Sequence, residues 1–87
     1  MEEYYTYILY SGSFHQTYVG QTNNIEKRLE RHNAGMVSST KRYKPWILLH
    51  AEKFQNRSEA MKREKYLKSG SGREFIKQLL LEYSRKC

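Results

Sequence analysis

Short apolar stretches alternate with polar ones along this chain, and their spacing predicts three strands and three helices. Residues 4–10 are rich in tyrosine, threonine and isoleucine, which is typical of a strand, and a Ser-Gly-Ser turn signal follows at 11–13. Residues 17–19 are predicted to form the returning strand of a hairpin. When the hairpin is centred on this turn, Tyr7 lies opposite Tyr18, and both side chains project from one face of the sheet.

Each predicted helix begins at a polar capping residue that is followed three positions later by glutamate. The three pairs are Asn23 with Glu26, Asn56 with Glu59, and Ser71 with Glu74. The first helix is expected over 24–33 with Gly35 as its left-handed cap, and the second is expected to end near Lys68. After a short flexible break at 69–72, the third helix carries an apolar stripe between Phe75 and Tyr83.

The third predicted strand, over 46–51, is bulky and mostly apolar, and a polar loop at 36–44 precedes it. The resulting order of elements is β-β-α-β-α-α. The most economical arrangement is an α+β domain with a three-stranded antiparallel sheet flanked by helices, and residues 1–87 are expected to form one such domain. Gly20, next to the returning strand of the hairpin, predicts a close approach of another group to its backbone.

Positive charge dominates the composition. The chain has 16 lysines and arginines against 9 acidic residues, a formal net charge of +7. This charge favours polyanionic partners, nucleic acid first and an anionic membrane surface second, and the alternative is a basic soluble protein without such a partner. The polar loop contains four residues that are predicted to bind nucleic acid: Lys41, Arg42, Tyr43 and Lys44. The cations would follow the phosphate backbone, and Tyr43 would stack on a base.

Three features of the sequence bear on the cellular compartment. The chain has a single cysteine, Cys87, which excludes an internal disulfide and a cysteine metal cluster and fits a reducing cytoplasm. The start Met1-Glu2-Glu3-Tyr4 is acidic and lacks a long apolar run, which argues against a signal peptide. Because no stretch approaches the roughly 20 apolar residues that span a bilayer, we expect a cytoplasmic protein without a membrane segment.

Glu64 is a candidate metal ligand in the second predicted helix. It shares a helix face with Ala60 and Leu67, and a carboxylate among apolar neighbours needs a compensating cation or donor. A hard divalent cation is one such partner, because Mg²⁺ commonly uses one or two carboxylates together with phosphate and water oxygens. The alternative is an exposed glutamate that pairs with Lys68 at i+4 or with Lys65.

Arg28 and His32 lie at i and i+4 of the first predicted helix and therefore share a face. The long stem of Arg28 could reach along the sheet while its guanidinium meets a phosphate in bidentate fashion. His32 could accept or donate a proton near neutral pH. The alternative is a solvated basic face that merely attracts DNA or RNA.

Tyr7 and Tyr18 also have two interpretations. Strand tyrosines are usually packing residues with a solvated hydroxyl. A free phenol titrates at about pH 10, so adjacent cations or a metal-bound hydroxide would be needed to make one an effective base at neutral pH. His15 and His50 are predicted to be turn and strand residues with no cluster around them.

These residues, in this order, resemble the GIY-YIG nuclease domain over essentially the whole chain. Tyr5-Thr6-Tyr7 stands at the first motif of that family, and Tyr18-Val19-Gly20 stands at the second. Arg28 follows Tyr18 by ten residues, as the catalytic arginine of the family does, and Glu64 stands at the place of the metal-binding glutamate. Tyr5 and Thr6 replace the glycine and isoleucine of the first motif, whereas its catalytic tyrosine is present as Tyr7.

Shorter landmarks resemble the small stand-alone bacterial branch of the family, which is related to the N-terminal nuclease domain of excinuclease C. These landmarks are His32, Ser39-Thr40, Pro45-Trp46 and Glu59-Ala60. The resemblance implies one Mg²⁺ or Mn²⁺ ion on Glu64 and a charge-neutralising role for Arg28. It also implies that Tyr7 or Tyr18 orients or deprotonates the attacking water, with His32 sharing the proton transfer.

The function implied by the resemblance is metal-dependent hydrolysis of phosphodiester bonds by an endonuclease. The expected partner is nucleic acid, DNA more than RNA, and the expected selectivity is for structure rather than sequence, as in DNA repair or recombination. A catalytically silent nucleic-acid-binding module is the main alternative. A protein-interaction role without anion binding is the other, and the net charge argues against it.

Overall fold

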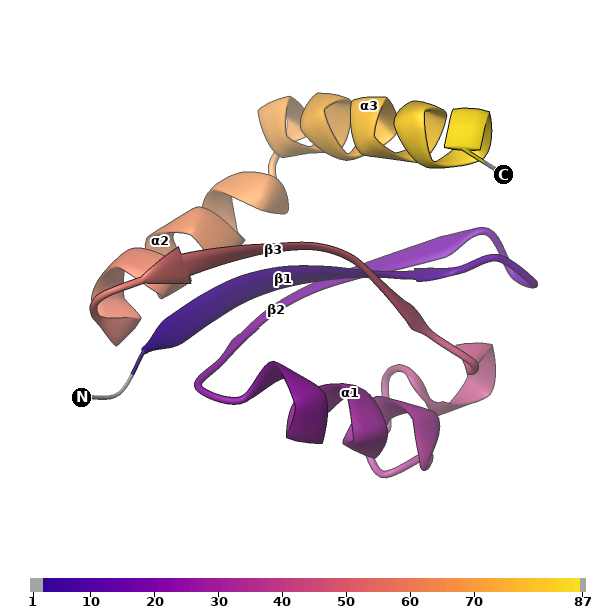
Figure 1. Ribbon diagram of the computed structural model, residues 1–87, viewed down its shortest axis with the longest axis horizontal. Coiled ribbons are helices and arrows are strands. Elements are labelled where there is room, and N and C mark those ends of the chain that lie inside the picture. Colours follow the sequence, from indigo (N-terminus) through magenta and orange to yellow (C-terminus); the bar gives the residue numbers. More distant parts are fainter. Residues whose placement is uncertain (1–2, 87) are drawn as a thin grey trace.

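The computed structural model describes residues 3–86 and contains the predicted elements in the predicted order (Figure 1). The strands are β1 (Tyr4–Ser11), β2 (Gln16–Thr22) and β3 (Ile47–Phe54). The helices are α1 (Ile25–Asn33), α2 (Arg57–Leu67) and α3 (Gly70–Lys86), and a single 3₁₀ turn, η1 (Lys41–Tyr43), precedes β3. The expectations that rest on Met1, Glu2 and Cys87 lie outside the described residues.

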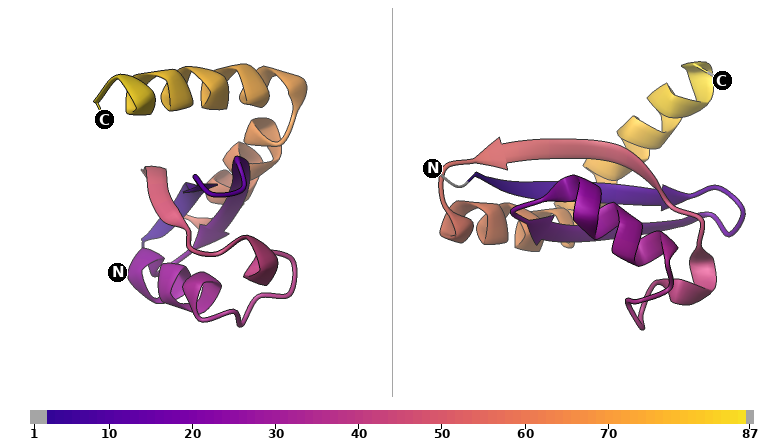
Figure 2. Two further views of the ribbon diagram at one scale, coloured as in Figure 1. Left: turned by 90° about the vertical axis from the view of Figure 1, so that its right-hand side faces the viewer. Right: turned by 60° about the horizontal axis from the view of Figure 1, so that its bottom comes forward.

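The strands form one antiparallel sheet in the order β2-β1-β3. Helix α1 and the loop after it cover one face of this sheet, and α2 and α3 cover the other, so the fold has three layers (Figure 1 and Figure 2, left). The predicted α+β fold class is therefore confirmed. No helix within residues 3–86 is long and apolar enough to cross a membrane.

The central strand β1 supplies both layers of the core, because neighbouring residues of a strand point to opposite faces of the sheet. On the face covered by α2 and α3 the buried core is aliphatic and consists of Ile8, Val19, Leu67 and Ile76. On the face covered by α1 it is largely aromatic and consists of Tyr7, Leu9 and Trp46. The two faces therefore offer different chemistry, and the candidate site lies on the aromatic one.

The hairpin register differs from the predicted one. Tyr7 pairs with Gly20, and Tyr18 pairs with Leu9, so the prediction that the two tyrosines lie directly opposite each other is wrong. The turn occupies residues 12–15 and is longer than the Ser-Gly-Ser signal suggested, which moves the centre of the hairpin by one residue. That change moves the partner of Tyr7 by two positions, and a shift of two keeps a side chain on the same face. Tyr7 and Tyr18 are therefore diagonal neighbours on one face, as the alternation of the strand requires.

Two of the three predicted helix starts need correction. Helix α2 begins as predicted, with the side chain of Asn56 accepting a hydrogen bond from the Glu59 backbone. Helix α1 is capped by Asn24 rather than Asn23, since the Asn24 side chain accepts from the Lys27 backbone. The end of α1 agrees with the prediction, because Gly35 has a φ of 77°.

The third helix starts earlier than predicted, and the capping pair of Ser71 and Glu74 is wrong. Helix α3 begins at Gly70, and the Ser69 hydroxyl accepts from the Gly72 backbone N–H at 3.4 Å. The predicted flexible break shortens to two residues, because Gly72 packs directly on the end of α2. A Cβ atom at Gly72 would overlap backbone atoms of Leu67, so this tight corner requires glycine. The third strand also extends beyond its predicted end, to Phe54.

Candidate active site

The phenol of Tyr7 lies across the backbone of the neighbouring strand. Tyr7 is only 2% exposed, and its partner in the register is Gly20. A Cβ atom at Gly20 would stand 2.6 Å from the Tyr7 hydroxyl oxygen, which is closer than real Cβ atoms approach. Glycine at this position is therefore what lets the phenol reach over β2, as the sequence predicted for Gly20.

The Tyr7 hydroxyl begins a buried chain of hydrogen bonds through His32 to Thr40. Tyr7 Oη lies 3.1 Å from His32 Nε2, and His32 Nδ1 lies 2.7 Å from Thr40 Oγ1. The Thr40 hydroxyl donates to the Val37 carbonyl oxygen at 3.4 Å, which uses its one proton. The Thr40 oxygen therefore accepts from Nδ1–H of His32, and Nε2 is left to accept from the Tyr7 O–H.

Burial keeps both members of the Tyr7–His32 pair neutral. It raises the pKa of Tyr7, the Tyr18 and Glu64 side chains add to this rise, and the Arg28 charge opposes it. Burial also lowers the pKa of His32, and the positive charges of Arg28 and Arg31 lower it further. Near neutral pH the pair therefore consists of a phenol that donates and an imidazole that is ready to take a proton.

Tyr18 completes an aromatic wall beside this chain of hydrogen bonds. Its ring centroid lies 6.3 Å from that of Tyr7 and 4.9 Å from that of His32. It also contacts Trp46 edge-on, with centroids 6.5 Å apart. Because Tyr18 is only half-buried, part of its side chain is accessible to a bound molecule.

Arg28 supplies positive charge to the same place. Its charge affects the pKa of both Tyr7 and His32, so its guanidinium is within electrostatic range of the buried pair. The side chain is half-buried, and within residues 3–86 it makes no side-chain hydrogen bond or ion pair. Arg28 is therefore a cation that is positioned by α1 and available to an anionic ligand.

Glu64 belongs to α2, a helix on the other face of the sheet from α1 (Figure 1). Its negative charge contributes to the raised pKa of Tyr7, which places it near the phenol. The carboxylate is 23% exposed and pairs with Lys68 Nζ at 2.8 Å, as the alternative interpretation of this residue anticipated. The structure thus brings Glu64 to the phenol and at the same time gives it a lysine partner.

The residues around Glu64 fit a divalent cation only if the substrate supplies further ligands. Within residues 3–86, no group of three or more histidine, cysteine, aspartate or glutamate side chains could enclose a metal ion. A single carboxylate is the donor set that Mg²⁺ uses when phosphate and water oxygens complete its coordination. Glu64 therefore suits an ion that is shared with a phosphate group and does not suit a closed protein site.

The four residues of the basic loop differ in their exposure. Lys41, Arg42 and Lys44 are exposed, whereas the ring of Tyr43 packs edge-on against Phe14 and Trp46. The Arg42 guanidinium lies 5.7 Å from the centre of the Tyr43 ring. Tyr43 therefore contributes to the aromatic core, and its stacking on a base remains a prediction.

Two sets of contacts were not predicted from the sequence, one at Thr40, which was named only within the Ser39-Thr40 landmark, and one at His50. Thr40 fixes the tautomer of His32, but a threonine eight residues after a histidine follows no helix or strand period that would link the two.

The prediction that nothing clusters around His50 is wrong, because His50 Nε2 and the Arg63 guanidinium both bind the Glu52 carboxylate. Burial alone would raise the pKa of Glu52, but these hydrogen bonds lower it. This cluster joins β3 to α2 on the face opposite the candidate site.

Comparisons with known proteins find relatives over most of the chain. A family model described as the GIY-YIG catalytic domain matches residues 3–77. A UPF0213 protein of Staphylococcus haemolyticus is 36% identical over 80 residues, which are 91% of this chain and 96% of the relative. A UPF0213 protein of Oceanobacillus iheyensis is 36% identical over 86 residues, covering 98% and 96% of the two chains.

A solved structure shows the same arrangement of elements. The solution NMR structure of a UPF0213 protein from Bacillus halodurans aligns with a TM-score of 0.52 at 28% sequence identity. The alignment covers 88% of this chain and 84% of that protein.

Proposed function

The chain belongs to the GIY-YIG catalytic domain family, which is a nuclease family, and we propose that it is a divalent-metal-dependent endonuclease. It hydrolyses phosphodiester bonds of nucleic acid, DNA in preference to RNA, as a single cytoplasmic domain that serves repair or recombination. Its selectivity is for the structure of the substrate rather than its sequence, because phosphate contacts position a nucleic acid without reading its bases.

The observation that supports the proposal most is the buried hydrogen-bond chain from Tyr7 through His32 to Thr40, with Arg28 beside it. A histidine in the interior of a small domain needs only one hydrogen bond per ring nitrogen to be satisfied. Here the acceptor nitrogen is aimed at a phenol that reaches over Gly20. That direction gives a proton a path away from the site, which a packing role does not require.

In the proposed mechanism the phenol orients the attacking water, and the imidazole receives the proton. The water passes a proton to the Tyr7 oxygen as the Tyr7 proton moves to Nε2 of His32, so the phenol is unchanged and the histidine becomes protonated. The lowered pKa of His32 makes the protonated state short-lived and returns the site to its starting form. Tyr18, in the wall beside the pair, helps to orient the same water.

Charge that develops on the phosphate is neutralised from two sides. Arg28, which makes no ion pair within residues 3–86, stabilises the negative charge of the transition state. A Mg²⁺ or Mn²⁺ ion on Glu64 would supply Lewis-acid stabilisation of the phosphoryl and leaving oxygens. Removing one contact of this type typically lowers the rate by about 10²–10³.

A nucleic-acid-binding module without turnover is the second candidate. The observation in its favour is the ion pair between Glu64 and Lys68, which gives the carboxylate a partner without a metal. The acceptor nitrogen of His32 is aimed at the Tyr7 hydroxyl, an arrangement that binding alone does not require, so we regard catalysis as the better proposal.

The test is cleavage of branched, flapped and single-stranded DNA and RNA by the wild type and by Glu64→Gln, in Mg²⁺ or Mn²⁺. We expect the wild type to cut at least one DNA structure and Glu64→Gln to be about 10²–10³ slower. Glu59→Gln, at an exposed position of α2, removes the same charge and should cut at the wild-type rate. Equal cleavage by wild type and Glu64→Gln would remove Glu64 from the mechanism. Salt-sensitive binding without cleavage would support the second candidate.

A further inference from the structure

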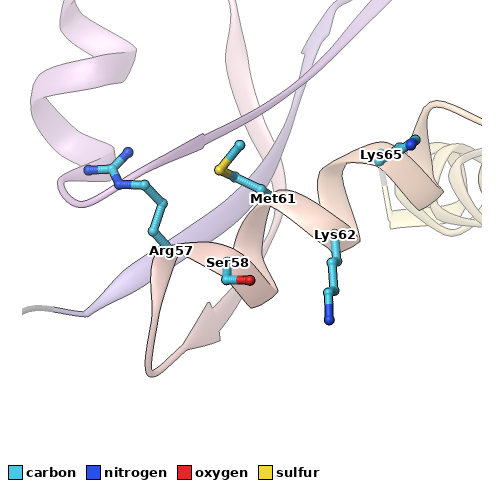
Figure 3. Close-up of a pocket in the computed structure, with 5 residues that line it drawn as sticks. All are labelled: Arg57, Ser58, Met61, Lys62 and Lys65. Carbon is cyan, nitrogen blue, oxygen red and sulfur yellow. The ribbon is translucent and has the colours of Figure 1, made fainter.

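The outer face of α2 carries an open depression lined by basic side chains. Its volume is about 510 Å³, and its lining residues are Arg57, Ser58, Met61, Lys62 and Lys65 (Figure 3). The lining contains three cations and no acidic side chain. Within residues 3–86, neither Lys62 nor Lys65 forms an ion pair, so their charges are not cancelled by a neighbour.

The depression adjoins the candidate site along the helix. Arg57, Met61, Glu64 and Lys68 recur at intervals of three or four residues and therefore form one row along α2. Lys65, next to Glu64, lines the depression, and Lys68, the partner of Glu64, lines a second depression of about 260 Å³. Arg73 and Tyr18 also line this second depression. Basic concavities thus lie on both sides of the carboxylate.

Arg57 stands at the N-terminal end of this row, and its side chain is held by two contacts. Its guanidinium lies 4.9 Å from the centre of the Tyr4 ring, and its NH1 group donates to the Gln21 side chain at 3.3 Å. Figure 3 shows this side chain reaching from the start of α2 toward the strand-to-helix connection that precedes α1. Arg57 thus extends the positive surface from α2 toward the element that carries Arg28.

We propose that this face of α2, which comprises the row together with Lys62 and Lys65 of the depression beside it, binds the phosphate backbone of the nucleic acid next to the bond that is cut. The inference rests on the proposed function. It states where the substrate strand lies on the protein, before and after the phosphate next to Glu64. At about 1.5 Å per residue, Arg57 to Lys65 spans about 12 Å, the axial length of three to four nucleotides in a duplex strand. Met61, which is 51% exposed between the cations, offers an apolar surface that a sugar ring can cover.

The experiment measures the salt dependence of binding to the best-bound DNA without divalent metal, so that no cleavage is needed. The variant Lys62→Gln/Lys65→Gln should weaken binding uniformly across sequences and reduce the slope of log K against log salt by about 2, roughly 1 for each lost contact. The matched control, Arg85→Gln/Lys86→Gln, removes the same charge from the last turn of α3, at the far end of the sheet from the start of α2 (Figure 1). The control should keep the wild-type slope.

Three results would overturn the inference. The first is an unchanged slope in the α2 variant, and the second is an equal loss in the α3 control, which would reduce the effect to net charge. The third is preferential binding of the wild type to phosphatidylglycerol vesicles that the α2 variant loses, since the surface would then bind a membrane. Absence of cleavage with metal would contradict the proposed nuclease function and would leave the salt result standing, so the two failures are distinguishable.

Discussion

The two faces of the sheet are built from the same three strands and are stabilised in different ways. On the face toward α2 and α3, Ile8, Leu67 and Ile76 exclude water by shape and volume. On the face toward α1, Tyr7 and His32 are as deeply buried but carry polar atoms. Within residues 3–86, every buried side-chain polar atom has a hydrogen-bond partner. The aliphatic face supports stability through packing. The polar face holds reactive groups at fixed positions, and each buried polar group that loses its hydrogen-bond partner lowers the free energy of unfolding.

The largest expected effect tests the aliphatic face at the corner between α2 and α3. Gly72→Ala places a methyl group against the backbone of Leu67, so the corner must open, and we expect the free energy of unfolding to fall by about 3 kcal/mol. Urea denaturation measures this loss. Gly70→Ala is the control, because within residues 3–86 its added Cβ would meet no heavy atom within 4 Å apart from its chain neighbours and the nearby backbone of its own helix. If packing on the aliphatic face does not affect the candidate site on the other face, the Gly72→Ala protein should cleave at the wild-type rate at a temperature where it is folded.

An intermediate effect is expected on the polar face at Thr40. Thr40→Val keeps the shape but leaves Nδ1–H of His32 without an acceptor, which costs about 1–3 kcal/mol of stability. It also lets His32 adopt the other tautomer, in which Nε2 no longer accepts from Tyr7, so cleavage should fall more than unfolding explains. Nitrogen NMR of the imidazole reports the tautomer directly.

Thr40→Ser is the matched control, because it retains the hydroxyl and should keep the wild-type tautomer. A Thr40→Val protein with the wild-type tautomer and the wild-type rate would show that the position of His32 does not depend on Thr40. In that case the polar face would resemble the aliphatic one, with packing as its main requirement.

The smallest expected effect is the dependence of stability on pH. Burial, with Arg28 and Arg31, lowers the pKa of His32 in the folded protein below the value of about 6.5 in the unfolded chain. Below that pH the unfolded chain binds the extra proton first, so the contribution of His32 is fully present above pH 6.5 and is lost as the pH falls toward the folded pKa. An NMR titration of the His32 ring protons gives the folded value, and a midpoint at or above 6.5 would contradict the neutral buried imidazole.

Much of the fold follows from local patterns in the sequence. The apolar and polar periods predicted the order of the elements, Asn56 predicted the start of α2, and the glycine at 35 predicted the end of α1. The errors lie where a local signal competes with packing. The turn at 12–15 is longer than its Ser-Gly-Ser signal, and α3 starts at Gly70 because Gly72 must meet the end of α2. Neither requirement can be recognised without the partner surface.

The candidate site shows the same division. The chain spacing and the family resemblance selected Tyr7, Arg28 and Glu64, and in the structure the charges of Arg28 and Glu64 both affect the pKa of Tyr7. The roles of these residues remain predictions, as does nucleic-acid binding by the loop at 41–44. Thr40 stood in a family landmark, but its contact with His32 could not be found from spacing, because the two residues lie in different parts of the chain's secondary structure. In the second cluster, Glu52 lies beyond the predicted end of its strand, and Arg63 reaches it from α2.

The sequence by itself determined the alternation that puts Tyr7 and Tyr18 on one face and the glycine that admits the phenol at position 20. These are properties of single strands, and a shift of two residues in the register does not alter them. Only the tertiary structure decided that the phenol meets His32, that Thr40 holds the imidazole in the accepting tautomer, and that Lys68 pairs with Glu64. The reason is physical: the protonation and orientation of a polar group depend on burial and on the neighbours that packing brings to it.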